Sequence, residues 1–483
     1  MIQLAPAPPL LFKRPDRLIW GGALAAGVVL GLLIMVGFTV ELGALAVVVA
    51  IAAVGWRWST GTAIFFAVFT PLNRFFLAGL HVLIHSGAVD KYALLWKDAL
   101  VAVVVTRVLY DALFSPTAKK VIFLDFLVLA FILLAAIYII YPGPERTDLF
   151  TRVQGFRTDA TFLFAYFIGR AIHLERRHVR WMMLGLVPGS LVITGVAIFE
   201  FLAPNTAAHL ISQYGLDGLE TVRSRSISGV DLPRASALMG DLALSFYQMV
   251  LIALAAALYF QSSGRRRVLF GLFLVAMVAT LVATLTRSAI LTSGVVIVLT
   301  GVITRRFGQL MLTALVAAIL GGTAFIVAGA RFDVVQRLTS LGDASTLGHE
   351  RALQRSLDII QGSPFGLGLG TAGTISQRQL GNLAITNENW YLQIGTEMGV
   401  IAAVLFLVIV GMVAWHGFAT YFRVHDVWLR ALALGVASGA IGFLILGNLL
   451  HAWENTILSM LFFMLAGIVV RARRLEASPD YAE

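Results

Sequence analysis

The sequence of 483 residues contains no cysteine. Disulfides, thiol nucleophiles and cysteine-ligated zinc are therefore excluded. Charged residues are also scarce: they make up 13% of the chain, against 59% hydrophobic residues, whereas a typical soluble domain has about 25% charged residues. A chain with so little charge is predicted to lie in a membrane rather than in water.

Long apolar segments are what the chain has in abundance. A helix of about 20 apolar residues spans a bilayer, so we predict an all-α, polytopic integral membrane protein with about 14 transmembrane helices, forming a single membrane domain over 1–483. A basic cluster precedes the first run and no small-residue cleavage site follows, which predicts an uncleaved first helix. The runs fall near 18–37, 40–55, 60–80, 95–113, 121–141, 159–174, 181–203, 237–260, 268–285, 288–304, 308–330, 395–416, 430–449 and 454–471.

The formal net charge of +10 is explained by membrane topology, because cytoplasmic loops of membrane proteins are rich in Lys and Arg. We therefore expect no nucleic-acid partner. The basic clusters fall on alternate connections, which predicts cytoplasmic termini. The same parity places 142–158, a smaller loop at 204–236 and a large loop at 331–394 outside the cytoplasm, and the large extracytoplasmic loop is followed by re-entry into the membrane.

Several arginines lie on the outward side, where topology does not require them. Arg287 lies between two apolar runs, where a charged side chain by default marks a functional site; the alternative is a guanidinium that reaches out to lipid headgroups. Arg234 either binds an anionic ligand or pairs with Asp241. Arg157 faces outward by the same parity. Together these arginines predict an anionic ligand on the outer side.

The segment that re-enters the membrane carries a candidate base. Thr386 or Asn387 is predicted to cap a helix, which places Glu388 in the first turn and Tyr391 one turn later on the same face. A carboxylate there either complements the helix dipole or accepts a proton from a sugar hydroxyl as a general base.

Other motifs are weighed in the same way. The glycine string 366–370 follows no predicted strand and precedes no phosphate-binding lysine, so it predicts a turn that approaches a ligand or another helix rather than a nucleotide site. His349 and His451 are alternative outward bases. His81 and His85 lack the glutamate of the zinc-protease motif, and we predict no metal site and no cofactor.

These segments resemble the O-antigen ligase/polymerase superfamily of bacterial membrane glycosyltransferases, most strongly over about 331–405 and moderately over about 234–295. In that family a helix bearing arginine precedes a Pro–x–Gly–x–Gly turn, which is similar to 351-RALQRSLDIIQGSPFGLGLG-370. The family then re-enters the membrane on His–Asn. Glu388 and Asn389 occupy the positions of this His–Asn pair, so glutamate replaces the histidine proposed as the base in the ligases.

The resemblance implies a GT-C-like fold in the bacterial inner membrane, with the active site facing the periplasm. It implies that Arg234 and Arg287 grip the diphosphate of a polyprenyl-linked, for example undecaprenyl-linked, glycan donor, with Glu388 as the base. We expect an inverting, metal-independent polysaccharide polymerase, for O-antigen or exopolysaccharide, that transfers the glycan to the end of another repeat unit. The expected substrate-binding residues are Arg351, Arg355, Arg157, Asn389 and Tyr391.

Two alternatives stay open at this point. A ligase would transfer the same donor glycan to a lipid or protein acceptor. A flippase for lipid-linked oligosaccharides also has many helices and internal arginines, but transporters of this kind commonly have pseudo-symmetric halves, and no internal repeat is visible. The expected partners are the lipid-linked donor, the glycan acceptor and membrane lipids, together with a flippase or a chain-length regulator.

Overall fold

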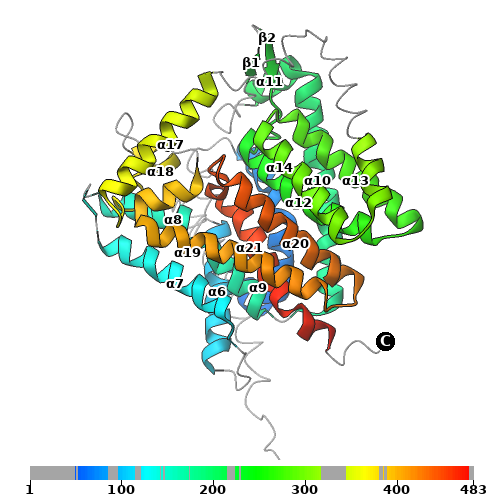
Figure 1. Ribbon diagram of the computed structural model, residues 1–483, viewed down its shortest axis with the longest axis horizontal. Helices are drawn as coiled ribbons and strands as arrows, with labels where there is room; N and C mark the ends of the chain where they lie inside the picture. Colours follow the sequence, from blue (N-terminus) through cyan, green and yellow to red (C-terminus); the bar gives the residue numbers. More distant parts are fainter. Residues whose placement is uncertain are drawn as a thin grey trace, which may run out of the picture.

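The computed structural model describes residues 49–50, 53–84, 96–114, 121–141, 143–144, 147–172, 174–214, 224–227, 230–316, 344–379, 385 and 389–477. Helices dominate this part of the chain (Figure 1). Its elements are α3 (Ser59–Phe69), η1 (Thr70–Leu72), α4 (Asn73–Ile84), α6 (Trp96–Phe114), α7 (Phe123–Ile140), α8 (Leu149–Asp159), η2 (Thr161–Leu163), α9 (Phe164–Ala171), α10 (Arg176–Leu202), α11 (Pro204–Gln213), β1 (Ser224–Ile227), β2 (Val230–Pro233), α12 (Asp241–Gln261), α13 (Gly264–Ala283), α14 (Arg287–Ile303), α17 (Ala344–Gly362), α18 (Gly373–Gln379), α19 (Trp390–Tyr421), α20 (Val427–Leu446), η5 (Ala452–Glu454) and α21 (Thr456–Glu476).

Eight helices of the described part are long and apolar enough to cross a membrane. This confirms the predicted all-α, polytopic membrane class, to which the structure adds one short antiparallel hairpin of β1 and β2. Each apolar run from 60 onward contains a described helix. The run at 18–37 and most of 40–55 lie outside the described residues, so the number of about 14 spans stays a prediction.

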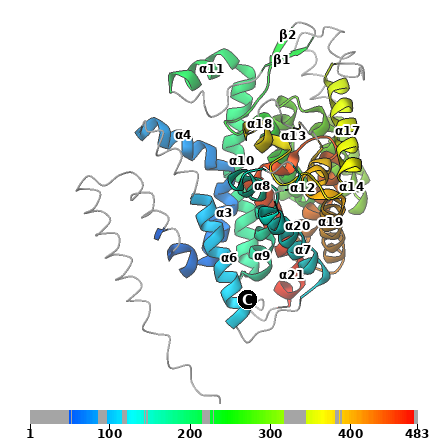
Figure 2. The same cartoon turned by 90° about the vertical axis from the view of Figure 1, so that its left-hand side faces the viewer.

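The core of the bundle surrounds α12. This helix packs against α13, α14 and α20, and 89% of its most apolar stretch is buried. A helix that is apolar on all sides is expected to be enclosed by other helices. The second layer pairs α19 with α20 and α7, and α21 with α9 (Figures 1 and 2).

The predicted outward loops gather at one end of the bundle. The hairpin and α11, from the loop at 204–236, lie in the upper part of both views, together with α17 and α18 from the loop at 331–394 (Figures 1 and 2). The two loops that the charge pattern assigns to one side are therefore close in space, although which side of the membrane they face stays a prediction.

Two spanning segments are interrupted. The run at 60–80 is split by η1, where Pro71 lacks the N–H that a helix interior needs. The second interruption is at Gly399 in α19, where φ is 82° and ψ is 173°, a conformation essentially restricted to glycine. The 3-10 turn at η1 keeps helical backbone angles, whereas Gly399 places non-helical backbone inside an apolar segment, where each polar group must find a partner.

The glycine turn at 362–373 supplies those partners for α19. The Leu367 N–H donates to the Thr396 carbonyl at 2.7 Å and the Gly368 N–H donates to the Glu397 carbonyl at 2.9 Å. Both carbonyls precede Gly399 and have lost their helical donors. Of the two roles predicted for the glycine string, approach to another helix is therefore the one that the structure shows.

Close packing explains why this turn is rich in glycine. A Cβ on Gly399 would overlap the Pro364 carbonyl, and a Cβ on Gly366 would overlap the carbonyl of Glu397. Both glycines have positive φ. A larger residue at either position would separate the turn from α19.

We predict that Gly399→Ala destabilises the protein, because alanine is strained at this φ and its methyl group collides with the turn. A strained backbone residue costs about 1–3 kcal/mol. Gly411→Ala is the matched control, since it lies in the same helix and its added Cβ meets nothing within 4 Å. Thermal unfolding in detergent should show a lower midpoint for Gly399→Ala alone; equal midpoints would contradict this role of Gly399.

The predicted orientation is testable because the chain has no native thiol. Gln377 in α18 and Arg266 in α13 are both exposed. A membrane-impermeant maleimide should label Gln377→Cys in intact cells with a permeabilised outer membrane, and should label Arg266→Cys only after lysis. The reverse pattern would overturn the orientation inferred from the basic clusters.

Candidate functional site

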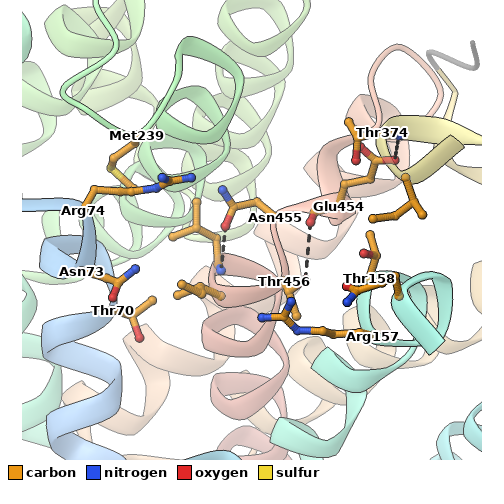
Figure 3. A pocket seen from close by; sticks show the side chains of 14 residues that line it. Thr70, Asn73, Arg74, Arg157, Thr158, Met239, Thr374, Glu454, Asn455 and Thr456 are labelled. Carbon is orange, nitrogen blue, oxygen red and sulfur yellow. Dashed lines mark hydrogen bonds between the residues drawn. The ribbon is translucent and has the colours of Figure 1, made fainter. Parts of the chain in front are cut away.

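A polar pocket of about 220 Å³ opens at the end of the bundle that carries the outward loops. The interruption at η1, the helices α4, α8 and α18, η5 and the start of α21 form its walls, as Figure 3 shows. The residues that line it are Thr70, Asn73, Arg74, Gln154, Arg157, Thr158, Met239, Thr374, Ile375, Glu454, Asn455, Thr456, Ile457 and Leu458.

Cationic side chains reach the pocket from two walls. Arg74 enters from α4, directly after the interruption at Pro71, and Arg157 enters from α8 on the opposite wall (Figure 3). Both are half-buried. Two guanidinium groups around a polar cavity favour an anionic ligand, because each can donate two parallel hydrogen bonds to carboxylate or phosphate oxygens.

Glu454 is the carboxylate of the pocket, and its side chain is 6% exposed. Its Oε1 accepts hydrogen bonds from the Thr374 N–H and from Gln393 Nε2, both at 2.9 Å. Its Oε2 lies 3.9 Å from His451 Nε2 and accepts no hydrogen bond from the described residues. One oxygen is thus anchored, while the other is buried beside the pocket and has no donor among the described residues.

Two further carboxyl groups lie behind Glu454. Asp159 ends α8 and Glu397 lies in α19, and each is 1% exposed. Glu397 Oε1 accepts from the Ala372 N–H at 2.9 Å, and the two carboxyl groups lie within hydrogen-bonding distance of each other. Burial, followed by the charge of Glu397, raises the pKa of Asp159 well above its ordinary value.

Arg234 lies in a network with Asp241 and with the turn before α14. It forms an ion pair with Asp241 at 2.6 Å and donates to the Thr284 carbonyl at 3.0 Å and to Thr286 Oγ1 at 3.1 Å. Arg287 follows Thr286 as the first residue of α14. The pairing of Arg234 with Asp241, one of the two predicted alternatives, is therefore formed, and the segments of the two predicted diphosphate-binding arginines are in direct contact.

The same two segments have a strained backbone. Ala237, Leu238 and Leu285 have φ values of 45°, 58° and 53°, which non-glycine residues rarely adopt. The Glu200 carboxylate holds the first segment by accepting from the Ser236 N–H at 2.6 Å and from the Ala237 N–H. Strain that persists because surrounding contacts enforce it gathers at functional sites. The Arg234 loop also supplies Met239 to the pocket wall.

The start of α19 differs from the prediction. Asn389, rather than Thr386 or Asn387, caps the helix: its backbone is extended and its Oδ1 accepts from the Leu392 N–H at 3.0 Å. The first turn therefore begins at Trp390, and the predicted placement of Glu388 in that turn is wrong. Glu388 itself lies outside the described residues, so its role as a base stays a prediction.

The other predicted binding residues are dispersed. Arg351 and Arg355 are exposed on α17, which packs against α19. Tyr391 is buried, and its hydroxyl donates to the Phe443 carbonyl at 3.1 Å, which holds α19 against α20. Of the predicted binding residues, Arg157 is the one that lines the pocket.

Sequence reasoning missed Arg74, Glu454, Asp159 and Glu397. Arg74 had a usable signal, because it is a charged residue within the apolar run at 60–80. Glu454 lies in the stretch that had been singled out only for His451. Glu397 carried the same signal as Arg74, because it lies within the apolar run at 395–416. Its closeness to Asp159 carried none, since the two are far apart in the chain and meet only when α8 packs near α19.

Comparison with known proteins gives one family match. Residues 272–407 match the family model described as O-antigen ligase. The match begins in α13, includes Arg287, α17 and the glycine turn, and ends in α19 beyond Gly399. No curated protein matches the chain.

Proposed function

We propose that the chain transfers a glycan from a polyprenyl-diphosphate-linked donor to the hydroxyl of an acceptor glycan; the match of residues 272–407 to the O-antigen ligase family model supports this. The pocket that holds Arg74 and Arg157 together with Glu454 is the observation that supports this most. We place the reaction at the periplasmic face of the bacterial inner membrane, where the charge pattern puts this end of the bundle.

The first requirement of the reaction is to stabilise the leaving diphosphate, and we assign this role to arginines. When the bond between the anomeric carbon and the phosphate oxygen breaks, its electron pair leaves with the diphosphate, and the developing negative charge must be stabilised. Arg74 and Arg157 line the pocket. Arg234 and Arg287 stand on the adjoining strained segments, and we assign them to the same diphosphate.

The second requirement is a base that takes the proton of the acceptor hydroxyl, and we assign this role to a carboxylate. The acceptor hydroxyl oxygen attacks the anomeric carbon from the side opposite the leaving diphosphate, so the displacement inverts the anomeric centre. The hydroxyl proton passes to a base. We assign this role to Glu454, which lines the pocket and whose Oε1 is anchored by two donors while Oε2 has none among the described residues. Glu388, which the family frame indicates, is the second candidate.

We propose a polymerase, in which the acceptor is the end of another repeat unit of an O-antigen or exopolysaccharide. The presence of Glu388 where the ligases have histidine favours this over ligation to a lipid or protein. The purified protein should convert a purified lipid-linked repeat unit into a ladder of longer products. Transfer only to a lipid or protein acceptor would indicate a ligase, and donor movement across liposomes without any transfer would indicate a flippase.

We predict that Arg157→Lys loses at least about tenfold in turnover, because lysine keeps the charge but not the planar fork that holds two phosphate oxygens. Arg152→Lys is the control on the same helix, since Arg152 donates instead to the Ile139 carbonyl at 2.6 Å. Arg287→Lys should behave like Arg157→Lys. Near-normal polymer with both Arg157→Lys and Arg287→Lys would remove these two arginines from the reaction.

Two glutamine variants distinguish the candidate bases. Removing a general base typically lowers the rate by about a hundredfold or more, whereas losing a helix-dipole contact costs only about 1 kcal/mol of stability. We expect Glu454→Gln to lose turnover, with little change in the melting temperature, and Glu388→Gln to lose less. Turnover and melting temperature should be measured on the same purified samples. A larger loss of turnover in Glu388→Gln than in Glu454→Gln would assign the role of base to Glu388.

A further inference from the structure

Asp159 and Glu397 form a pair that the reaction as described above does not use. Asp159 Oδ1 and Glu397 Oε2 are buried, and no group in the described ranges donates a hydrogen bond to either. Glu397 Oε1 does accept from the Ala372 N–H, but a buried ionised carboxylate with one oxygen left without a donor is still costly. Two such groups within hydrogen-bonding distance cannot both stay ionised, because like charges this close push the proton affinity of one of them upward.

The backbone connects this pair to Glu454. Glu397 accepts from the Ala372 N–H, and two residues later the Thr374 N–H donates to Glu454. Gly373 lies between them with a φ of +67°, and a Cβ there would collide with Glu454 Oε1. A shift of Glu397 therefore moves the segment that anchors Glu454.

The charged groups around the pair come from several elements. Glu454 of η5 acts electrostatically on both members. His451, which precedes η5, lies against Glu454. Arg157 precedes Asp159 by two residues on α8, and Arg74 faces the same pocket from α4. The pair and Glu454 therefore interact electrostatically.

We propose that Asp159 and Glu397 share one proton, and that this proton positions Glu454 and sets the pH range in which the pocket is active. The proposal rests on the proposed function. With the proton present, one carboxyl O–H donates to the other carboxylate and the pair carries a single negative charge. At high pH the proton is lost, the two groups repel, and the segment from Ala372 to Thr374 is released.

The sign of the pH dependence follows from Asp159. Because its pKa is raised in the folded protein, the folded state retains a proton that the unfolded chain releases above about pH 4. The stability contributed by this proton is therefore present in acid and is lost as the pH rises through the folded-state value. Stability and activity should both fall on the alkaline side.

Asp159→Asn tests the shared proton, since the amide N–H replaces the carboxyl O–H, donates to an ionised Glu397 and cannot be titrated. The alkaline limb of the pH–activity profile should move up by at least about one pH unit. In the double variant Asp159→Asn/Glu397→Gln neither side chain can be titrated, so the alkaline limb should move up as well. Asp148→Asn, at the exposed start of α8, is the control and should leave both limbs in place.

Thermal unfolding without substrate separates this proposal from the proposed function. The melting temperature of the native protein should fall as the pH rises from about 4 through the folded-state pKa of Asp159, and that of Asp159→Asn should fall less, even if no glycan transfer is found. If Asp159→Asn shifts neither the alkaline limb nor the pH dependence of melting, the pair does not share a titrating proton. If it only lowers the melting temperature equally at all pH values, the pair is merely a packing contact.

Discussion

The pocket depends on hydrogen bonds that α19 cannot make for itself. A bilayer offers no water to a broken helix, so the carbonyls freed at Gly399 must be paired by protein. The glycine turn pairs them, through the N–H groups of Leu367 and Gly368. Once the turn is fixed there, Ala372 and Thr374 are brought to the buried carboxylates Glu397 and Glu454.

A second interruption completes the pocket from the other wall. Pro71 breaks the run at 60–80, and Thr70, Asn73 and Arg74 around this break line the cavity. Non-helical backbone at membrane depth is tolerated where it is buried in protein or lines a cavity. The break at Gly399 meets that condition because it is buried against the glycine turn, while the 3-10 turn at Pro71 stays helical and lines the cavity.

The charges are arranged in two layers. Arg74 and Arg157 are half-buried at the cavity, where they can meet an anion from outside, while Asp159 and Glu397 are fully enclosed behind Glu454. The exposed layer suits the stabilisation of a leaving diphosphate by guanidinium groups. The enclosed layer does not line the pocket, and in our proposal it acts through the position of Glu454.

The sequence by itself determined the membrane class, most helical segments and the resemblance to the O-antigen ligase family, because apolar length and the Pro–x–Gly–x–Gly turn are local signals. It also identified Arg157, Arg234 and Arg287 as arginines without a topological reason. Tertiary structure decided which of these line the pocket, where α19 begins, and that Asp159, Glu397 and Glu454 are close together. The reason is physical: interactions between α8, the glycine turn, α19 and η5 depend on how the helices pack, and no local pattern of residues encodes that packing.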